Sequence, residues 1–415
     1  MTKTVQTLVT RLRAVSVGLA VAMVLVPAVA AQAQTLTVLY SFTGGADGGY
    51  PVDNGSLVRD AAGNLYGTTV YGGTGGCNTG YDSGCGTVFT VDTTGKETVL
   101  YSFTGIRGDG EYPSGGLVRD AAGNLYGTTD DGGAYGCGSV FMVDKTGKET
   151  VLYSFCSAQN DGTYPGAGLL RDAAGNLYGT TAKGGASNAG TVFKLDKAGK
   201  QTVLHSFTGG ADGGVPYAGL IRDAAGNLYG TTAWGGTSDD GTVFKLDTTG
   251  KETVLHSFKG RDGENPYGGL VRDAAGNLYG TTYDGGAYNT GCWGEGQEGC
   301  GVVFKLAATG KETVLHSFQA PPAGPEDGAL PSAGLVRDAA GNLYGTTTYG
   351  GESPCGCGTL FKVGKNGKET VLYTFTGGTD GGDPYAGLVR DAKGNLHGTA
   401  LESGFGDGTV FTLTP

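Results

Sequence analysis

The chain has 415 residues, of which 83 are glycine, and its 39 acidic side chains outnumber its 28 basic ones, for a net charge of −11. This balance excludes broad binding to nucleic-acid phosphates, which requires clustered lysine and arginine. Collagen is excluded too, because the glycines follow no three-residue period. They fall instead at fixed places of a longer repeat.

The first 33 residues differ from all the others. Basic residues precede an apolar run from Ala14 to Val29, and small residues typical of a cleavage site end at Ala33. This pattern predicts a secretory signal peptide that is cleaved near Ala33, with a membrane anchor as the alternative. No later apolar run reaches the length of a membrane span. We therefore expect residues 34–415 to be secreted, periplasmic or at the cell surface.

One segment, Gly269–Thr282 (GLVRDAAGNLYGTT), recurs seven times with small changes, at intervals of 50 to 65 residues. A period near 50 residues with several strand signals in each unit indicates a repeat architecture. The copies are marked by Arg59-Asp60, Arg119-Asp120, Arg171-Asp172, Arg222-Asp223, Arg272-Asp273, Arg337-Asp338 and Arg390-Asp391.

Each unit contains four short runs rich in β-branched and aromatic residues, here named runs a to d. In the fourth unit they are Gly219–Arg222, Asn227–Thr232, Gly241–Leu246 and Thr253–Phe258. An Asp-x-x-Gly turn joins run a to run b in every copy and run c to run d in most, which predicts tight hairpins. Four antiparallel strands repeated around an axis are typical of a β-propeller blade.

The two ends of the repeat array fit together. A run d, Thr37–Phe42, precedes any run a, and the last unit stops after its run c, which begins at Gly408. Seven blades are complete only if Thr37–Phe42 joins the last one, a closure that removes the open seam. We therefore predict an all-β, seven-bladed propeller of four-stranded blades over residues 34–415. An open β-solenoid is the alternative, but it has no use for such a permuted end.

The signature Gly-Leu-Val-Arg and its unit of about 50 residues resemble the GloVer tandem repeat of bacterial exported proteins, over Thr35–Pro415. The resemblance implies an exported repeat protein and brings no established reaction. The segment Asp-x-x-Gly-Asn-Leu-Tyr is similar, more loosely, to NHL and gluconolactonase-type propellers, some of which hold a central metal with acidic residues. The signature reads Gly116–Arg119, Gly269–Arg272, Gly334–Arg337 and Gly387–Arg390, with variants at Ser56–Arg59, Gly168–Arg171 and Gly219–Arg222.

Residues present in all seven units are interpreted as structural, because a single active site needs a unique constellation. The Arg-Asp pairs are expected to pair with one another or with turn backbone. His205, His256 and His316 replace the tyrosine of run d and are expected to be packed or hydrogen-bonded. Each Asp-Gly-x-x-Pro loop supplies one carboxylate, too few alone for calcium. We expect no cofactor, with calcium as an alternative.

The connection from run b to run c varies from 8 to 18 residues and shares a face with the connection from run d to run a. Variable loops on a rigid scaffold are where binding usually occurs. The position before the glycines of this loop changes character from blade to blade, as a polar or sugar-like ligand would require, although unselected drift is the alternative. These candidates are Tyr71, Asp131, Lys183, Trp234, Asp284, Tyr349 and Glu402, with Tyr288, Trp293, Glu295 and Glu298 in the longest loop.

The eight cysteines are typical of an oxidising compartment. Spacing across a loop or a hairpin predicts three disulfides. Cys355 and Cys357 remain; a bridge across one residue would be strained, and a free pair could bind metal or exchange thiols. The predicted bridges are Cys77–Cys85, Cys137–Cys156 and Cys292–Cys300.

The sequence contains no nucleophile elbow, phosphate loop or metal-binding histidine pair. We expect a monomeric, non-enzymatic binding module that recognises a polymer such as a glycan, or a protein, through its b–c loops. Two alternatives stay open: a metal-dependent hydrolase or lactonase with its site in the central channel, and a purely structural envelope protein.

Overall fold

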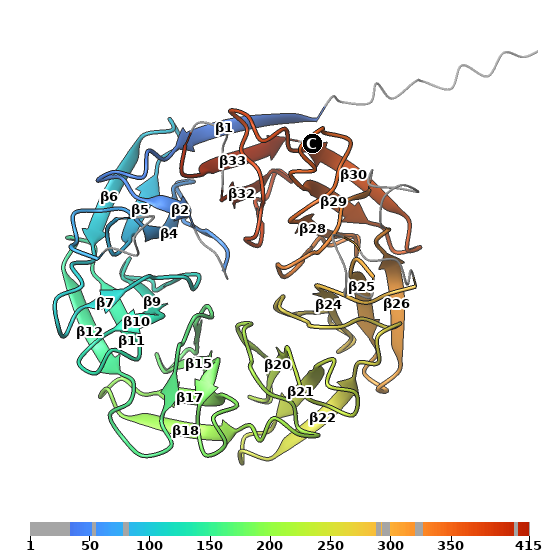
Figure 1. Ribbon diagram of the computed structural model, residues 1–415, viewed down its shortest axis with the longest axis horizontal. Coiled ribbons are helices and arrows are strands. Elements are labelled where there is room, and N and C mark those ends of the chain that lie inside the picture. Colours follow the sequence, from blue (N-terminus) through green and yellow to red (C-terminus); the bar gives the residue numbers. More distant parts are fainter. Residues whose placement is uncertain are drawn as a thin grey trace, which may run out of the picture. The chain divides into compact units, whose positions relative to one another are not determined.

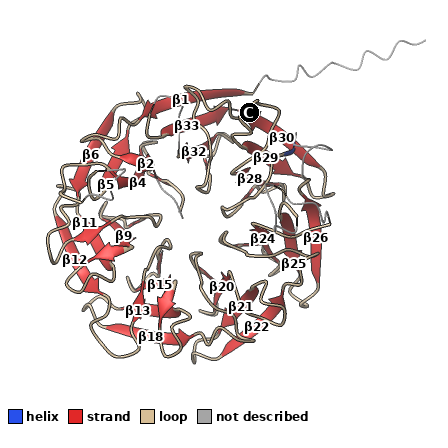
Figure 2. Cartoon of the chain, viewed as in Figure 1, coloured by secondary structure: helices blue, strands red, loops and turns tan. Residues whose placement is uncertain are grey.

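The computed structural model describes residues 34–51, 55–77, 83–287, 292, 299–319, 327–401 and 406–414. The predicted signal peptide lies outside these residues. Seven antiparallel four-stranded sheets form a closed ring (Figure 1), which confirms the predicted seven-bladed propeller. Short strands alternate with long loops around the ring (Figure 2). Within the described part, no helix is both long and apolar enough to cross a membrane.

Each blade contributes its four runs as strands. The inner strand has two residues and the outer three have five to seven. In blade order they are β3 (Val58–Arg59), β4 (Leu65–Tyr71), β5 (Thr87–Val91), β6 (Glu97–Ser102); β8 (Val118–Arg119), β9 (Leu125–Thr129), β11 (Ser139–Val143), β12 (Glu149–Ser154); β14 (Leu170–Arg171), β15 (Leu177–Thr181), β17 (Thr191–Leu195), β18 (Gln201–Ser206); β19 (Ile221–Arg222), β20 (Leu228–Thr232), β21 (Thr242–Leu246), β22 (Glu252–Ser257); β23 (Val271–Arg272), β24 (Leu278–Thr282), β25 (Val302–Leu306), β26 (Glu312–Ser317); β27 (Val336–Arg337), β28 (Leu343–Thr347), β29 (Thr359–Val363), β30 (Glu369–Thr374); β31 (Val389–Arg390), β32 (Leu396–Ala400), β33 (Thr409–Thr414), β1 (Thr35–Ser41).

The seventh blade closes the ring with strands from both ends of the described chain. Strand β1 pairs antiparallel with β33, from Thr35 opposite Thr414 to Ser41 opposite Thr409. Beyond the strands, the backbone N–H of Phe42 donates to the carbonyl of Gly408 at 2.9 Å. Figure 1 shows β1 as the outer edge of this blade. The predicted closure by Thr37–Phe42 is confirmed.

Phenylalanine pairs fill the space between neighbouring blades. The phenylalanine that ends each run d meets the phenylalanine of run c in the next blade edge to face, with centroids 5.0 to 5.3 Å apart. Phe207 and Phe244 form one such pair, and both are fully buried. Gly230 of run b leaves room for this ring, because an added Cβ would lie 2.7 Å from Cζ of Phe244. The interblade core therefore depends on an aromatic residue and a glycine in fixed register.

The a–b and c–d turns share one face, here named the turn face. In the fourth blade, the Asp223 carboxylate accepts hydrogen bonds from the backbone N–H and side-chain amide of Asn227 and from the Tyr229 hydroxyl, at 2.8 to 3.0 Å. Arg272 of the next blade stacks over the Tyr229 ring, 5.8 Å from its centroid. Of the two expected roles, binding of turn backbone is confirmed for the aspartate, whereas the arginine reaches the tyrosine of the preceding blade and does not pair with the aspartate beside it.

The glycines of the Gly-Leu-Val-Arg signature line the axis, where the innermost segments meet. An added Cβ on Gly116 would lie 2.9 Å from the backbone N of Ser56 and 3.0 Å from Cα of Gly55. The Gly387 N–H donates to the Gly55 carbonyl at 2.9 Å, which ties the last blade to the first. At Gly116, Gly219 and Gly334, backbone of the adjacent blade occupies the space of a side chain, whereas an added Cβ on Gly269 would lie 4.0 Å from its nearest neighbour.

Candidate functional site

The b–c and d–a loops form the opposite face, here named the loop face. Six of the predicted binding positions lie here, and each pairs with a d–a loop residue of its own blade. Two of these loop ladders form short strand pairs: β7 (Gly110–Glu111) with β10 (Asp131–Gly132), and β13 (Gly162–Thr163) with β16 (Lys183–Gly184). A third loop strand, β2 (Gly49–Pro51), places Gly49 opposite Tyr71. The remaining pairs are Gly214 with Trp234, Glu264 with Asp284 and Ala329 with Tyr349. Glu402, Tyr288, Trp293, Glu295 and Glu298 lie outside the described residues.

The residue before the proline of each Asp-Gly-x-x-Pro loop has a positive φ, between 51° and 57°, in all seven blades. This conformation is uncommon for non-glycine residues and requires support from its surroundings. In the fourth blade, the Val215 N–H donates to the Ala189 carbonyl of the preceding blade at 2.8 Å, and its carbonyl accepts from the Ala233 N–H at 3.1 Å. The loops of neighbouring blades are thus fastened together into a rigid surface.

Four tyrosines from three blades meet on the loop face. The rings of Tyr217 and Tyr267 lie 5.5 Å apart, and those of Tyr267 and Tyr283 lie 5.3 Å apart. Tyr283 shares a hydrogen bond with Tyr385. We name these four residues the tyrosine cluster. Tyr217, Tyr267 and Tyr385 lie in the d–a loops that enter the fourth, fifth and seventh blades, and Tyr283 lies in the b–c loop of the fifth blade, so no short sequence window contains them.

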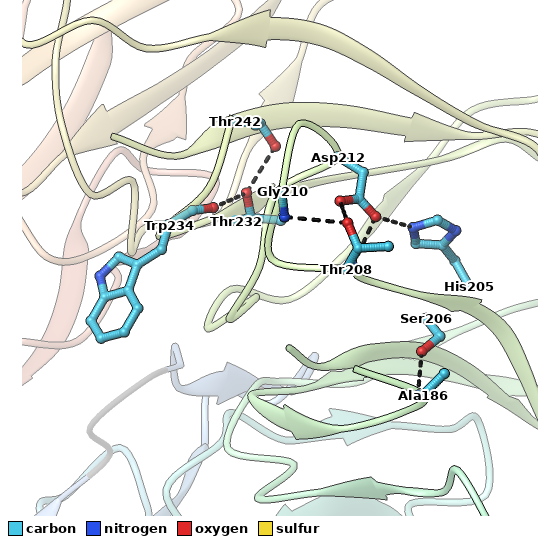
Figure 3. Close-up of polar contacts among 9 residues, drawn as sticks. All are labelled: Ala186, His205, Ser206, Thr208, Gly210, Asp212, Thr232, Trp234 and Thr242. Carbon is cyan, nitrogen blue, oxygen red and sulfur yellow. Dashed lines mark hydrogen bonds and ion pairs between the residues drawn. The ribbon is translucent and has the colours of Figure 1, made fainter. Parts of the chain in front are cut away.

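Trp234 extends the tyrosine cluster toward solvent. Trp234 is 52% exposed, and its indole N–H is near enough to the Tyr267 hydroxyl to oppose the rise that burial causes in the pKa of that tyrosine. Figure 3 shows the indole projecting away from the threonines that hold its backbone. There, the Thr232 hydroxyl donates to the Trp234 carbonyl at 3.0 Å and pairs with the Thr242 hydroxyl at 2.8 Å. The backbone of Trp234 is therefore held in place by hydrogen bonds, and its indole ring is exposed to solvent and accessible to a ligand.

Asp284 places a carboxyl group beside the tyrosine cluster, next to Tyr283 in the chain and near Tyr267. Burial raises the pKa of this carboxyl to about 6. Burial likewise raises the pKa of the adjacent Tyr283, and the neighbouring Tyr385 adds to this effect. At neutral pH the cluster therefore presents tyrosine hydroxyls in their protonated form beside a carboxylate, a combination of donors and acceptors suited to a hydroxyl-rich ligand.

The central channel contains a cavity of about 290 Å³. Its wall consists mainly of the signature glycines and of the leucine that follows each, with Tyr267, Tyr385 and Ser332 also on the lining. Among the described residues, no carboxylate or histidine lines this cavity, and no group of three or more metal-ligating side chains occurs.

A second cavity, of about 220 Å³, adjoins the tyrosine cluster through Tyr217. Asp130, Tyr164 and Lys183 also line it. The Lys183 ammonium lies 5.3 Å from the centroid of the Tyr164 ring. Tyr217 thus borders a cavity lined by an acidic and a basic side chain, Asp130 and Lys183, and also contacts the tyrosine cluster beside the channel.

A second group of three tyrosines lies in the loops of the first two blades. The Tyr71 ring lies 5.5 Å from that of Tyr50 and 5.6 Å from that of Tyr112, in edge-to-face contacts. Of the predicted positions, Tyr71 therefore belongs to this group, whereas Trp234 and Asp284 belong with the tyrosine cluster and Lys183 lines the second cavity.

Sequence reasoning missed the position directly after the loop proline, which supplies three members of the tyrosine cluster. A signal was present, because this position changes from blade to blade as strongly as the predicted one does. It holds Val52, Ser114, Gly166, Tyr217, Tyr267, Ser332 and Tyr385, of which Val52 lies outside the described residues.

The aspartates of the Asp-Gly-x-x-Pro loops, which were considered as calcium ligands, accept hydrogen bonds within their own loops. The Asp212 carboxylate accepts from the Thr208 N–H at 2.9 Å and also contacts the Thr208 hydroxyl (Figure 3). His205 Nε2 lies 3.5 Å from the same carboxylate, in keeping with the predicted packed role of the run d histidines. Burial, and next the charge of Asp212, raise the pKa of Glu252 in the following blade to about 7.

All eight cysteines are bonded. The three predicted bridges, Cys77–Cys85, Cys137–Cys156 and Cys292–Cys300, are present. Cys355 and Cys357, whose state the sequence left open, also form a disulfide.

Solved structures similar to this chain share its fold at low sequence identity. An extracellular domain assigned to a one-component system of B. thetaiotaomicron matches with a TM-score of 0.52 and 10% identity, over 90% of this chain and 40% of that one. A gluconolactonase of Xanthomonas campestris matches with a TM-score of 0.44 and 15% identity, over 81% of this chain and 90% of that one. No curated protein sequence matches at a significant level.

The repeat itself identifies the family. The model of the Gloeobacter/Verrucomicrobia repeat matches residues 74–294 and 292–415, which together exceed half of the chain. These ranges contain six of the seven copies of the signature and the loops that form the tyrosine cluster. The chain therefore belongs to the Gloeobacter/Verrucomicrobia repeat family, as its Gly-Leu-Val-Arg signature indicated.

Proposed function

We propose that this protein is an exported, non-enzymatic binding module that holds a glycan on its loop face. The observation that carries the proposal is the tyrosine cluster with the exposed Trp234 beside it. Aromatic faces stack on the C–H surfaces of sugar rings, while tyrosine hydroxyls and a carboxylate form hydrogen bonds with sugar hydroxyls. All of these groups occur together here and on a rigid support.

The arrangement of the two cavities supports an extended ligand. Tyr217 borders the second cavity and contacts Tyr267, which borders the channel cavity. A chain of sugar units could therefore lie across the tyrosines with one end at Asp130 and Lys183. The four disulfides support an extracellular location, because such bonds persist in oxidising compartments.

Affinity electrophoresis tests the proposal with neutral and acidic soluble polysaccharides, for example xyloglucan, hydroxyethylcellulose and alginate. The purified chain should be retarded by at least one of them. Tyr267→Ala and Trp234→Ala should weaken that binding about tenfold or more, since buried aromatic anchors dominate binding energies. Tyr135→Ala is the matched control, because Tyr135 is 56% exposed and lies outside the tyrosine cluster.

Equal binding by all three variants would contradict the proposed site. Binding to none of the polysaccharides, with capture of a protein partner that still requires Trp234, would replace the glycan by a protein. Release of shorter sugars or opened lactones during the assay would make the module an enzyme.

A further inference from the structure

The four disulfides differ in their exposure. Cys85, Cys292 and Cys300 are at most 3% exposed, and Cys77, Cys137 and Cys156 are partly buried. Cys355 is exposed, and its partner Cys357 is partly buried. Attack on a disulfide requires access to a sulfur atom. Of the four bridges, Cys355–Cys357 is the one whose first sulfur is carried by an exposed residue.

Stability does not explain this bridge. Its cysteines are two residues apart, whereas the other pairs are 8, 19 and 8 residues apart. A cross-link stabilises a fold mainly by restricting the unfolded chain, and this effect decreases with the length of the closed loop. A ring that encloses a single residue restricts the unfolded chain very little.

Blades without cysteines close the same loop by hydrogen bonds. In the fourth blade, the Gly235 N–H donates to the Asp239 carboxylate at 2.8 Å, and the Gly241 N–H donates to the Gly235 carbonyl at 3.0 Å. In the sixth blade, the Gly350 N–H donates to the Gly356 carbonyl at 2.9 Å, and the Gly358 N–H donates to the Gly350 carbonyl at 3.0 Å. The loop of the sixth blade therefore has backbone hydrogen bonds of its own in addition to the bridge.

The surroundings of the bridge favour opening from one side. Gly356, between the cysteines, has φ +62°, a conformation that glycine adopts without cost. Gly377 of the adjacent d–a loop backs the bridge, since an added Cβ there would lie 2.6 Å from Sγ of Cys357 and 3.2 Å from Sγ of Cys355. The Ser353 hydroxyl lies 3.2 Å from Sγ of Cys355.

We propose that Cys355–Cys357 is a thiol–disulfide exchange site that oxidises a dithiol of another exported protein. One thiolate of that dithiol attacks Sγ of Cys355. The Cys355–Cys357 bond breaks, and its electron pair leaves on Sγ of Cys357, which takes a proton from water. The second thiolate of the substrate attacks the substrate sulfur that is bonded to Cys355; a disulfide forms within the substrate, and Cys355 leaves as a thiolate that takes a proton from water. The substrate loses two electrons, and the bridge gains them.

The cycle closes by the reverse exchange with a low-molecular-weight disulfide such as oxidised glutathione, which receives the two electrons. None of the other three bridges contains an exposed cysteine, so these bridges serve as internal references within the same molecule. This site is independent of the proposed glycan site, which contains no cysteine.

Graded glutathione redox buffers, followed by alkylation and mass spectrometry of each cysteine, test the first half of the proposal on the folded chain. Cys355 and Cys357 should become alkylated at a ratio of reduced to oxidised glutathione at least tenfold lower than the other six cysteines require. The tryptophan fluorescence of the folded protein should not change at that ratio. Opening of all four bridges together, or of this one last, would overturn the proposal.

Two single variants test the direction of attack. In Cys357→Ser, the exposed Cys355 thiol should form a mixed disulfide with oxidised glutathione at least tenfold faster than Cys357 does in Cys355→Ser. The oxidised wild type should also speed disulfide formation in reduced, unfolded ribonuclease A, and both variants should fail to do so. Equal adduct rates, or equal ribonuclease oxidation by wild type and variants, would contradict the assigned site.

Discussion

The turn face and the loop face of this propeller are built from the same seven units but follow opposite rules. On the turn face, each aspartate in the Asp223 position accepts from its Asn partner, and in six blades a tyrosine hydroxyl also donates to it. On the loop face, equivalent positions hold Ser114, Gly166 or Tyr217. Repetition therefore marks the scaffold, and departure from repetition marks the surface available to a ligand.

The seventh blade is instructive on this point. His397 replaces the tyrosine of the turn network; its Nε2 lies 3.7 Å from the Asp391 carboxylate, beyond hydrogen-bond distance, and its Nδ1 pairs instead with the Thr412 hydroxyl at 2.7 Å. Burial lowers the pKa of His397, against the effect of Asp391. This substitution on the turn face thus exchanges one buried contact for another, whereas substitutions on the loop face change the groups that the surface offers to a ligand.

The largest loss of stability should come from a substitution at the axis of the ring, where the innermost segments of neighbouring blades pack closely. Gly116→Ala places a Cβ against the backbone of Ser56 and Gly55. We expect a loss of about 2 kcal/mol in the free energy of unfolding, because overpacking a site that cannot relax costs 1–3 kcal/mol. Denaturant unfolding measures it. Gly76→Ala is the control, since nothing lies within 4 Å of its added Cβ; equal stability of the two variants would refute the packing argument.

A smaller effect should separate the faces directly. Asp223→Ala removes the acceptor of three hydrogen bonds on the turn face and should cost roughly 1–2 kcal/mol of stability. Binding on the loop face should not change. Trp234→Ala should do the reverse, weakening ligand binding with the thermal midpoint unaltered. Thermal unfolding and affinity electrophoresis on both variants check these expectations. A variant that changed both stability and ligand binding would contradict the separation of structural and binding roles between the two faces.

The smallest effect concerns the carboxyl groups between blades. Burial, and then Asp212, raise the pKa of Glu252 to about 7, so the folded state holds this proton more tightly than the unfolded chain does. The resulting stability is fully present below the ordinary pKa of glutamate and is lost as the pH rises through about 7. Glu252→Gln should therefore raise the thermal midpoint by roughly 1–2 °C at pH 8 and not at pH 4.

The third blade offers the reciprocal variant. Gln201 already takes the place of this glutamate, and its side-chain amide donates to the Asp161 carboxylate at 3.4 Å. Gln201→Glu should lower the thermal midpoint at pH 8 and leave it unchanged at pH 4. The same response at both pH values would show that packing, and not charge, distinguishes the two side chains.

The sequence by itself determined the seven units, the hairpins within each unit, the closure by Thr37–Phe42 and three of the four disulfides. These features depend on neighbours along the chain or on the count of repeats, and both can be read from spacing. The residues that face the loop surface could be listed in part for the same reason, since Trp234 and Asp284 occupy a recognisable place in the repeat.

Only the tertiary structure decided which residues of different blades meet. It placed Arg272 on Tyr229 of the preceding blade, brought Tyr385 to Tyr283 and bonded Cys355 to Cys357. Contacts between blades depend on the angle at which successive sheets turn about the axis, and a repeat fixes the order of its units without fixing that angle. The candidate site lies at such contacts. For that reason Tyr217, Tyr267 and Tyr385 were not identified from the sequence.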